Sequence, residues 1–262
     1  MAVAFDNGPL LAHPWLGQGA AAVRRGLGRA LNLVFPPTCL ACRKAVGEAG
    51  GLCPECWGAM RFIERPYCER LGTPFENDYG GELISAAAAS DPPAYRRARA
   101  VARFEDGPAR RLVHRLKYGD RIDLAEAMAG WMARAGAQLI AECDVIAAVP
   151  LHPTRLMMRQ FNQAAILARH VAKKSGKPLV VQALRRVKAT RSQVGLTRND
   201  RAANVQGAFR ADENAPIRGA NVLLLDDVLT SGATVNAAAR ALLRGGAKNV
   251  DVLVFARVVT TA

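Results

Sequence analysis

A single run near the carboxyl end, residues 223–234 (LLLDDVLTSGAT), constrains the fold of this chain most strongly. Three apolar residues precede two adjacent acids, a hydroxyl- and glycine-rich loop follows, and residues 235–243 then have helical spacing. This order predicts a strand, a loop and a helix. The backbone N–H groups of such a loop and the helix N-terminus suit a phosphate, and two adjacent carboxylates suit neighbouring hydroxyls such as those of ribose. The run therefore predicts a sugar-phosphate site, against the simpler alternative of a buried strand, an acidic turn and a capped helix.

The bulk properties describe a globular chain with an affinity for anions. Half of its 262 residues are hydrophobic, enough for one sizeable core and a small appendage. A net charge of +14 favours nucleic acid, phosphorylated metabolites or acidic surfaces, although Arg-rich chains can be basic without such partners. No apolar run reaches the roughly 20 residues that span a bilayer, and the N-terminus lacks a secretory pattern. We expect a cytoplasmic chain with no integral membrane segment.

Strand and helix patterns alternate from about residue 98 onward. Strands are predicted over 99–104, 144–149, 205–210, 222–225 and 250–256, and helices over 108–118, 124–140 and 162–174. The strands at 222–225 and 250–256 are almost continuously apolar, as expected for a sheet covered on both faces. These patterns predict an α/β fold with a mostly parallel sheet flanked by helices.

Four segments make up the predicted domain organisation. Residues 1–35 form a leader that ends in an amphipathic helix, which either packs on the neighbouring domain or lies on a membrane surface. Residues 36–80 form a small Cys-rich domain, residues 81–97 a linker, and residues 98–262 the α/β domain.

The Cys-rich segment contains two CxxC pairs, Cys39 with Cys42 and Cys53 with Cys56. Two such turns complete a tetrahedral site of four thiolates, which predicts a structural Zn²⁺ that contributes to folding. A redox CxxC is the alternative, and two copies so close together argue against it. Cys68 has no partner at CxxC spacing, because position 71 is Leu.

Two further segments have features of an anion site. Pro150, Leu151, His152 and Arg155 follow a predicted core strand, and ligands of parallel sheets bind beyond the carboxyl ends of the strands. His152 either contacts a ligand or is satisfied by the backbone. The segment around Arg191, Gln193 and Arg198 is rich in basic residues, so it either binds an anion or forms a solvated basic face.

The run at 223–234 resembles the phosphoribosyl pyrophosphate (PRPP) signature of type I phosphoribosyltransferases. The order of motifs along the chain is similar to that of the ComF family: the four-cysteine segment comes first, then VHRLKYG at 113–119, VPLHPTR, FNQ, TRSQ and DDVLTSGAT. Gln160 stands where a Gly is usual, and Leu71 where a Cys is usual. The resemblance covers residues 36–258 and implies a phosphoribosyltransferase-like fold behind a four-cysteine zinc ribbon.

The resemblance also implies the roles of the site residues. Asp226 and Asp227 hold the ribose hydroxyls, and the 5′-phosphate loop consists of Thr230, Ser231, Gly232, Ala233 and Thr234. The pyrophosphate loop includes Pro150, Leu151, His152 and Arg155, and a mobile loop with Arg191, Gln193 and Arg198 closes over PRPP.

Three functions are compatible with this resemblance. In the first, PRPP binds with Mg²⁺ and its phosphoribosyl group is transferred to a nitrogen acceptor, in a protein linked to DNA uptake in natural competence. In the second, the chain is a non-catalytic PRPP sensor that docks a helicase-like partner or single-stranded DNA. The third is nucleic-acid binding driven by charge alone.

Overall fold

The computed structural model describes residues 36–78, 80–118, 123–152, 156, 161–188 and 198–259. The leader and amphipathic helix predicted over 1–35 lie outside these residues, as do Arg155, Arg191 and Gln193 of the predicted loops. No helix among the described residues is long and apolar enough to cross a membrane.

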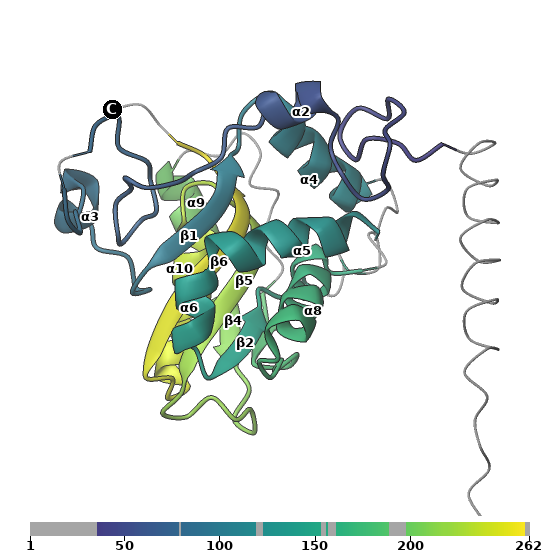
Figure 1. Ribbon diagram of the computed structural model, residues 1–262. Coiled ribbons are helices and arrows are strands. Elements are labelled where there is room, and N and C mark those ends of the chain that lie inside the picture. Colours follow the sequence, from purple (N-terminus) through teal and green to yellow (C-terminus); the bar gives the residue numbers. More distant parts are fainter. Residues whose placement is uncertain are drawn as a thin grey trace, which may run out of the picture.

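A four-stranded parallel sheet forms the centre of the molecule (Figure 1). Its order is β1 (Ala98–Arg103), β6 (Asn249–Arg257), β5 (Asn221–Leu229) and β2 (Val145–Ala148). Residues 178–180 extend along the outer edge of β2, where the N–H of Ile146 donates to the carbonyl of Pro178 at 2.9 Å. The parallel sheet confirms the predicted fold class.

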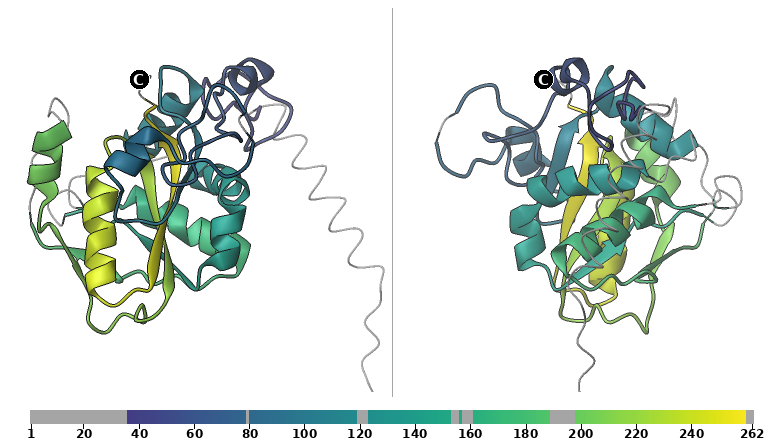
Figure 2. Two further views of the ribbon diagram at one scale, coloured as in Figure 1. Left: turned by 90° about the vertical axis from the view of Figure 1, so that its left-hand side faces the viewer. Right: turned by 45° about the vertical axis from the view of Figure 1, so that its right-hand side comes forward.

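Helices and a small antiparallel pair of strands cover the two faces of this sheet (Figure 2). On one face lie α4 (Pro108–Tyr118), α5 (Leu124–Ala135), α6 (Ala137–Glu142) and α8 (Gln163–Ser175). On the other lie α9 (Arg198–Val205), α10 (Ala233–Arg244) and the antiparallel pair β3 (Leu184–Arg186) and β4 (Phe209–Ala211). In β5, Leu223 and Leu225 face the first core and Leu224 the second. Because both faces are buried, the strand is apolar at every one of these positions.

Two predicted elements differ in the structure. The single helix predicted over 124–140 is wrong, because the chain turns at Gly136 from α5 into α6. A Cβ atom at Gly136 would lie 2.7 Å from Cδ2 of Leu253, so the side chain of Leu253 in β6 packs closely against this turn. The strand predicted over 205–210 is also misplaced, since α9 ends at Val205 and β4 begins only at Phe209.

The N-terminal segment packs on one end of the α/β layers. It contains α2 (Pro54–Gly58) and α3 (Ala86–Ser90), and it joins the sheet where the N–H of Ile63 donates to the carbonyl of Val101 at 2.9 Å. The segment 81–97, predicted as a linker, contains α3 and a Tyr95 that is only 2% exposed. That segment is therefore part of the packed structure.

Candidate functional site

The acid pair lies within β5, whose strand continues through both acids to Leu229. Asp226 is half-buried and Asp227 is buried, and the N–H of Asp227 donates to Oδ1 of Asp226 at 2.9 Å. Burial and the neighbouring Asp227 carboxylate raise the pKa of Asp226 to about 7. The sheet thus places two carboxylates side by side at the carboxyl end of a central strand, where ligands of parallel sheets bind.

Two basic side chains approach this pair from elements distant in sequence. Lys117, near the end of α4, has its Nζ 2.9 Å from Oδ2 of Asp227. Arg186 of β3 is buried against the ring of Phe209, and its charge lowers the pKa of Asp226, as does that of Lys117. Both cations offset the repulsion between the two acids, although burial remains the larger effect.

The loop after β5 has the form of an anion cradle. Gly232 precedes α10 in the left-handed region, with φ +81°, which glycine adopts without strain. Residues 230–234 therefore turn sharply and lead into the N-terminus of α10, which is 12 residues long. Within this turn the Oγ atom of Ser231 is buried without a hydrogen-bond partner among the described residues. A buried hydroxyl in that position suits a ligand oxygen.

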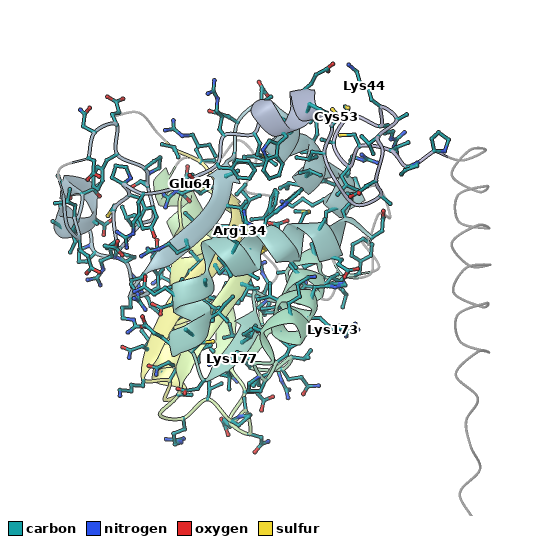
Figure 3. All side chains as sticks on the ribbon, viewed as in Figure 1. Lys44, Cys53, Glu64, Arg134, Lys173 and Lys177 are labelled. Carbon is teal, nitrogen blue, oxygen red and sulfur yellow. The ribbon has the colours of Figure 1, made fainter. Side chains whose placement is uncertain are left out.

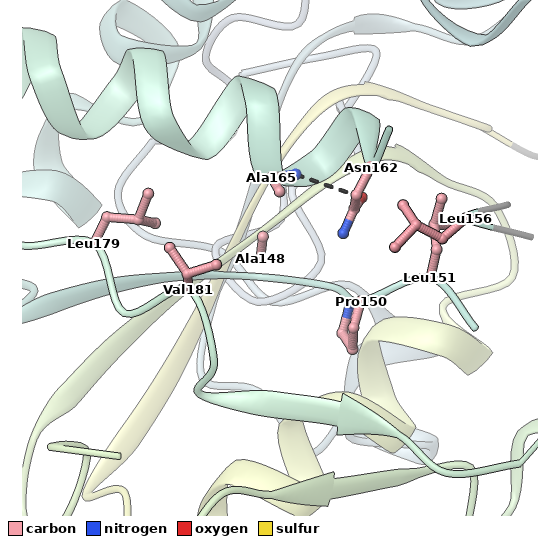
Figure 4. A pocket seen from close by; sticks show the side chains of 8 residues that line it. All are labelled: Ala148, Pro150, Leu151, Leu156, Asn162, Ala165, Leu179 and Val181. Carbon is pink, nitrogen blue, oxygen red and sulfur yellow. Dashed lines mark hydrogen bonds between the residues drawn. The ribbon is translucent and has the colours of Figure 1, made fainter. Parts of the chain in front are cut away.

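The second predicted loop begins directly after β2, beside the start of α8. Asn162 caps that helix, since its Oδ1 accepts from the N–H of Ala164 at 3.1 Å while its Nδ2 donates to the carbonyl of Val149. A cavity of about 230 Å³ lies here (Figure 4), lined by Ala148, Pro150, Leu151, Leu156, Asn162, Ala165, Leu179 and Val181. Among the described residues that line it, only Asn162 has a polar side chain.

The third predicted loop lies between two elements whose positions are fixed by an antiparallel strand pair. Its described ends are β3 and α9, which is followed by β4, and the N–H of Val187 donates to the carbonyl of Ala208 at 2.9 Å. Arg198 is the first residue of α9. The antiparallel pair therefore holds the two ends of this basic segment on the α10 side of the sheet, near the strand that carries the acids.

The four predicted zinc ligands come together beside α2. The Sγ atoms of Cys39, Cys42, Cys53 and Cys56 all lie within 4.8 Å of one another. Zn–S bonds of about 2.3 Å place tetrahedral sulfurs about 3.8 Å apart, and the Sγ atoms of Cys42 and Cys53 are 3.6 Å apart. Cys53 is buried, and it lies close to the exposed Lys44 (Figure 3).

The electrostatics of this cluster also fit a divalent cation. Burial opposes the ionisation of Cys39, but the N–H groups of Cys53, Cys42 and Ala41 lower its pKa to about 6. Burial and the neighbouring thiols raise the pKa of Cys56 to about 12. Four sulfurs this close do not all ionise without a compensating charge, which Zn²⁺ supplies when it binds. The arrangement is a structural Zn²⁺ site with four protein ligands.

Cys68 belongs to a separate turn. Its Sγ accepts hydrogen bonds from the N–H of Leu71 at 3.4 Å and from both the N–H and the Oγ of Ser85 at 3.3 Å. Burial opposes ionisation of this thiol, but those donors lower its pKa. We call residues 38–45 the first turn and residues 67–74 the second turn.

Sequence reasoning assigned no role to Lys117 or Arg186. A signal for Lys117 was present, because it follows buried Val113 by four residues and so lies on the apolar face of α4. No local signal marks Arg186, since the approach of β3 to β5 depends on the packing of the whole sheet.

Comparison with known proteins agrees with this architecture. Residues 30–88 match the family described as double zinc ribbon domain, and residues 162–261 match the phosphoribosyl transferase domain. The DNA utilization protein YhgH of Salmonella typhimurium is 33% identical over 234 residues, which cover 86% of this chain and 99% of that protein.

Competence protein F of Haemophilus influenzae is 28% identical over 84% of this chain and 96% of its own length. A solved structure of an allosteric regulatory enzyme of purine biosynthesis is 19% identical, with a TM-score of 0.38 over 54% of this chain and 30% of that one. A similarity at that score supports no inference of its own. The relatives of nearly equal length and the two matching domains show that the chain belongs to the ComF family.

Proposed function

We propose that this protein binds PRPP together with Mg²⁺ and transfers its phosphoribosyl group to a nitrogen acceptor, in a process that serves DNA uptake or use. The names of two relatives, DNA utilization protein YhgH and Competence protein F, support the biological context. The phosphoribosyl transferase domain supports the substrate class.

The observation that carries this proposal is the turn at residues 230–234. It combines a left-handed Gly232, the N-terminus of α10 and a buried Oγ of Ser231 that has no hydrogen-bond partner in the part of the chain that the structure describes. A 5′-phosphate bound there would accept hydrogen bonds from this hydroxyl and from the N–H groups of the turn. The ribose hydroxyls of the same ligand would then reach Asp226 and Asp227.

In the proposed reaction the lone pair of the acceptor nitrogen forms a bond to C1′ while the bond from C1′ to the diphosphate oxygen breaks. Pyrophosphate leaves with that electron pair, and the nitrogen loses its proton to solvent. The acid pair would hold the ribose hydroxyls and orient C1′, and positioning and charge neutralisation would supply most of the rate. Mg²⁺, which prefers carboxylate and phosphate oxygens, would supply charge neutralisation on the diphosphate.

Calorimetric titration with Mg²⁺ and PRPP tests the site. The wild type should bind, Asp226→Asn/Asp227→Asn should lose binding, and Ser231→Ala should weaken it by about tenfold because one buried donor is lost. Ser90→Ala is a matched control on α3, far from the acids in sequence, and should bind normally. If a folded, zinc-loaded wild type does not bind PRPP, the proposal fails.

The raised pKa of Asp226 predicts that the affinity for PRPP depends on pH. Since burial and Asp227 raise this pKa to about 7, the carboxylate that accepts ribose hydroxyls is mostly protonated at pH 6 and mostly ionised at pH 8. PRPP affinity should therefore rise roughly fivefold to tenfold between these values, beyond the change that titration of PRPP itself produces. The Asp226→Asn protein has no carboxyl at this position, so the pH dependence of its PRPP affinity measures the change that titration of PRPP itself produces.

The raised pKa of Asp226 has the opposite effect on the stability of the fold, which falls as pH rises. A carboxyl whose pKa is raised by folding stabilises the protein below its unfolded pKa of about 3.8, and that contribution is lost as pH rises through about 7. Asp226→Asn should therefore raise the melting temperature at pH 8 and change it little at pH 4. An unchanged melting temperature at pH 8 would mean that burial does not disfavour the ionised carboxylate of Asp226.

A second candidate function is a PRPP sensor without turnover, which docks a helicase-like partner or single-stranded DNA. The observation that favours it is α4, which contacts the zinc ribbon through Arg111 and the acid pair through Lys117. A sensor would bind PRPP tightly but release no pyrophosphate with any of a panel of bases and amines. Its partner binding would change with PRPP in the wild type and not in the Asp226→Asn/Asp227→Asn protein.

A further inference from the structure

The end of α4 places an ammonium group beside the acids that the proposed function assigns to ribose. The side chain of Lys117 is 22% exposed and that of Asp227 is 11% exposed, with 2.9 Å between Nζ and Oδ2. An ammonium group has three donors, so a single ion pair does not exhaust its capacity for hydrogen bonds.

The helix that carries Lys117 is anchored along its length. Leu112, Val113 and Leu116 are fully buried in the core under α5 and the sheet. On the other side, Arg115 donates to the carbonyl of Leu40, and Nη2 of Arg111 lies 3.7 Å from Sγ of Cys56. Because α4 is held by both the core and the zinc ribbon, the lysine is presented from a rigid element rather than from a loop.

We propose that Lys117 is a PRPP-binding residue whose ammonium group contacts the ribose hydroxyls or the adjoining diphosphate. The inference rests on the proposed function. If Asp227 accepts a hydrogen bond from a ribose hydroxyl at about 2.7 Å, the hydroxyl oxygen and Nζ of Lys117 both lie within hydrogen-bond distance of the same carboxylate. If the hydroxyl also binds Oδ2, the two are at most about 6 Å apart, within reach of a flexible lysine side chain.

Charge supports the same assignment. PRPP is a polyanion, and Asp226 and Asp227 would repel it unless nearby cations reduce the negative potential. Lys117 sits on the acid pair itself and lowers the pKa of Asp226 through its charge. If α4 needed only a tether to the sheet, an apolar side chain packed against it would serve at least as well as a half-buried ion pair.

Four proteins test this assignment by calorimetry with Mg²⁺ and PRPP. The wild type reports on the proposed function itself. Lys117→Gln keeps a neutral donor for Asp227, and Lys117→Arg keeps the charge. Lys174→Met is the control, because Lys174 of α8 pairs with Glu126 of α5 at 3.7 Å. Melting temperatures of all four, without ligand, report on folding.

The expected result is a tenfold or greater loss of PRPP affinity in Lys117→Gln with a melting temperature near that of the wild type. Lys117→Arg should recover part of this affinity, and Lys174→Met should bind like the wild type. The pH at which PRPP binding is half lost should also rise in Lys117→Gln, because the acids lose a cation.

Three results would overturn the inference. If the wild type binds PRPP and Lys117→Gln binds within about threefold of it, a difference of less than about 1 kcal/mol, then Lys117 is only a tether for α4. If the wild type does not bind PRPP at all, the inference falls together with the proposed function. If Lys117→Gln melts at a lower temperature than the wild type, Lys117→Arg decides between the two roles. A wild-type melting temperature with weakened PRPP binding in Lys117→Arg supports the contact. Full PRPP affinity in Lys117→Arg, with lowered melting temperatures in both Lys117 variants, means that Lys117 is only a tether.

Discussion

The first and second turns of the N-terminal segment follow the same backbone path with different chemistry inside. In each, the fourth residue after the cysteine, Arg43 or Gly72, has φ +67° and donates its N–H to the carbonyl of that cysteine. In each, the cysteine N–H donates at 2.8 Å to the residue five positions on, Lys44 or Thr73. The first turn places Cys42 where the second has Leu71, so the second has a single thiol.

What replaces the metal in the second turn is a set of ordinary polar contacts. Ser85 donates twice to Cys68, and Arg99 of β1 pairs with Glu69 and lies 4.3 Å from the ring of Tyr67. Gly72 allows a close approach, since a Cβ there would lie 2.4 Å from the carbonyl oxygen of Ala98. The same backbone path is therefore compatible with a cluster of thiol ligands in the first turn and with hydrogen bonds to a single thiol in the second.

The largest expected effect is the loss of metal from the first turn. Cys53→Ser removes a ligand, and a structural zinc contributes on the order of 10 kcal/mol of folding free energy. We expect residues 36–60 to become sensitive to proteolysis while the α/β layers stay folded. Limited proteolysis and zinc analysis check this, with Cys68→Ser as the matched control that keeps its full zinc content. Equal zinc loss in both variants would mean that Cys68 also binds metal.

The next effect is the removal of the buried ion pair that supports the second turn. Glu69→Gln leaves the guanidinium of Arg99, which is 4% exposed, without its charged partner. Breaking a buried pair in this way destabilises a protein by roughly 3–5 kcal/mol. Denaturant unfolding should show this loss both with and without a chelator, because no metal is involved. A loss that appears only with the chelator would contradict the comparison.

A smaller effect is expected from the thiol of the second turn. Cys68→Ala leaves the N–H and hydroxyl of Ser85 and the N–H of Leu71 without their acceptor, a loss of about 1–2 kcal/mol. Thermal unfolding should detect it. Cys68→Ser restores an acceptor and should recover part of the stability. Were Cys68→Ala as stable as the wild type, hydrogen bonds to sulfur would not be what holds this turn.

The smallest effect belongs to the exposed pair beside the first turn. Nζ of Lys44 lies 2.6 Å from Glu55, but the two side chains are 61% and 73% exposed. Solvent screens such pairs, so Lys44→Met should change neither the melting temperature nor the zinc content measurably. A clear drop in zinc affinity would show that Lys44 acts on the thiolates.

Local patterns in the sequence determined much of this protein. The run at 223–234 predicted the order of strand, turn and helix, because each of its parts depends on neighbouring residues. Cysteine spacing likewise predicted the four-thiol cluster, since two CxxC turns need only a short connection to meet. The helix over 108–118 was predicted with its observed bounds from its apolar period.

Only the tertiary structure decided which distant side chains meet at the acids and what fills the second turn. Lys117 and Arg186 reach the acid pair because α4 and β3 pack on the two faces of the sheet, and Arg99 reaches Glu69 because the second turn lies on β1. The close packing of Gly136 against a leucine of β6 is likewise a contact between distant residues. Such contacts join residues far apart in the chain, and the packing of the whole core, rather than any local propensity, determines them.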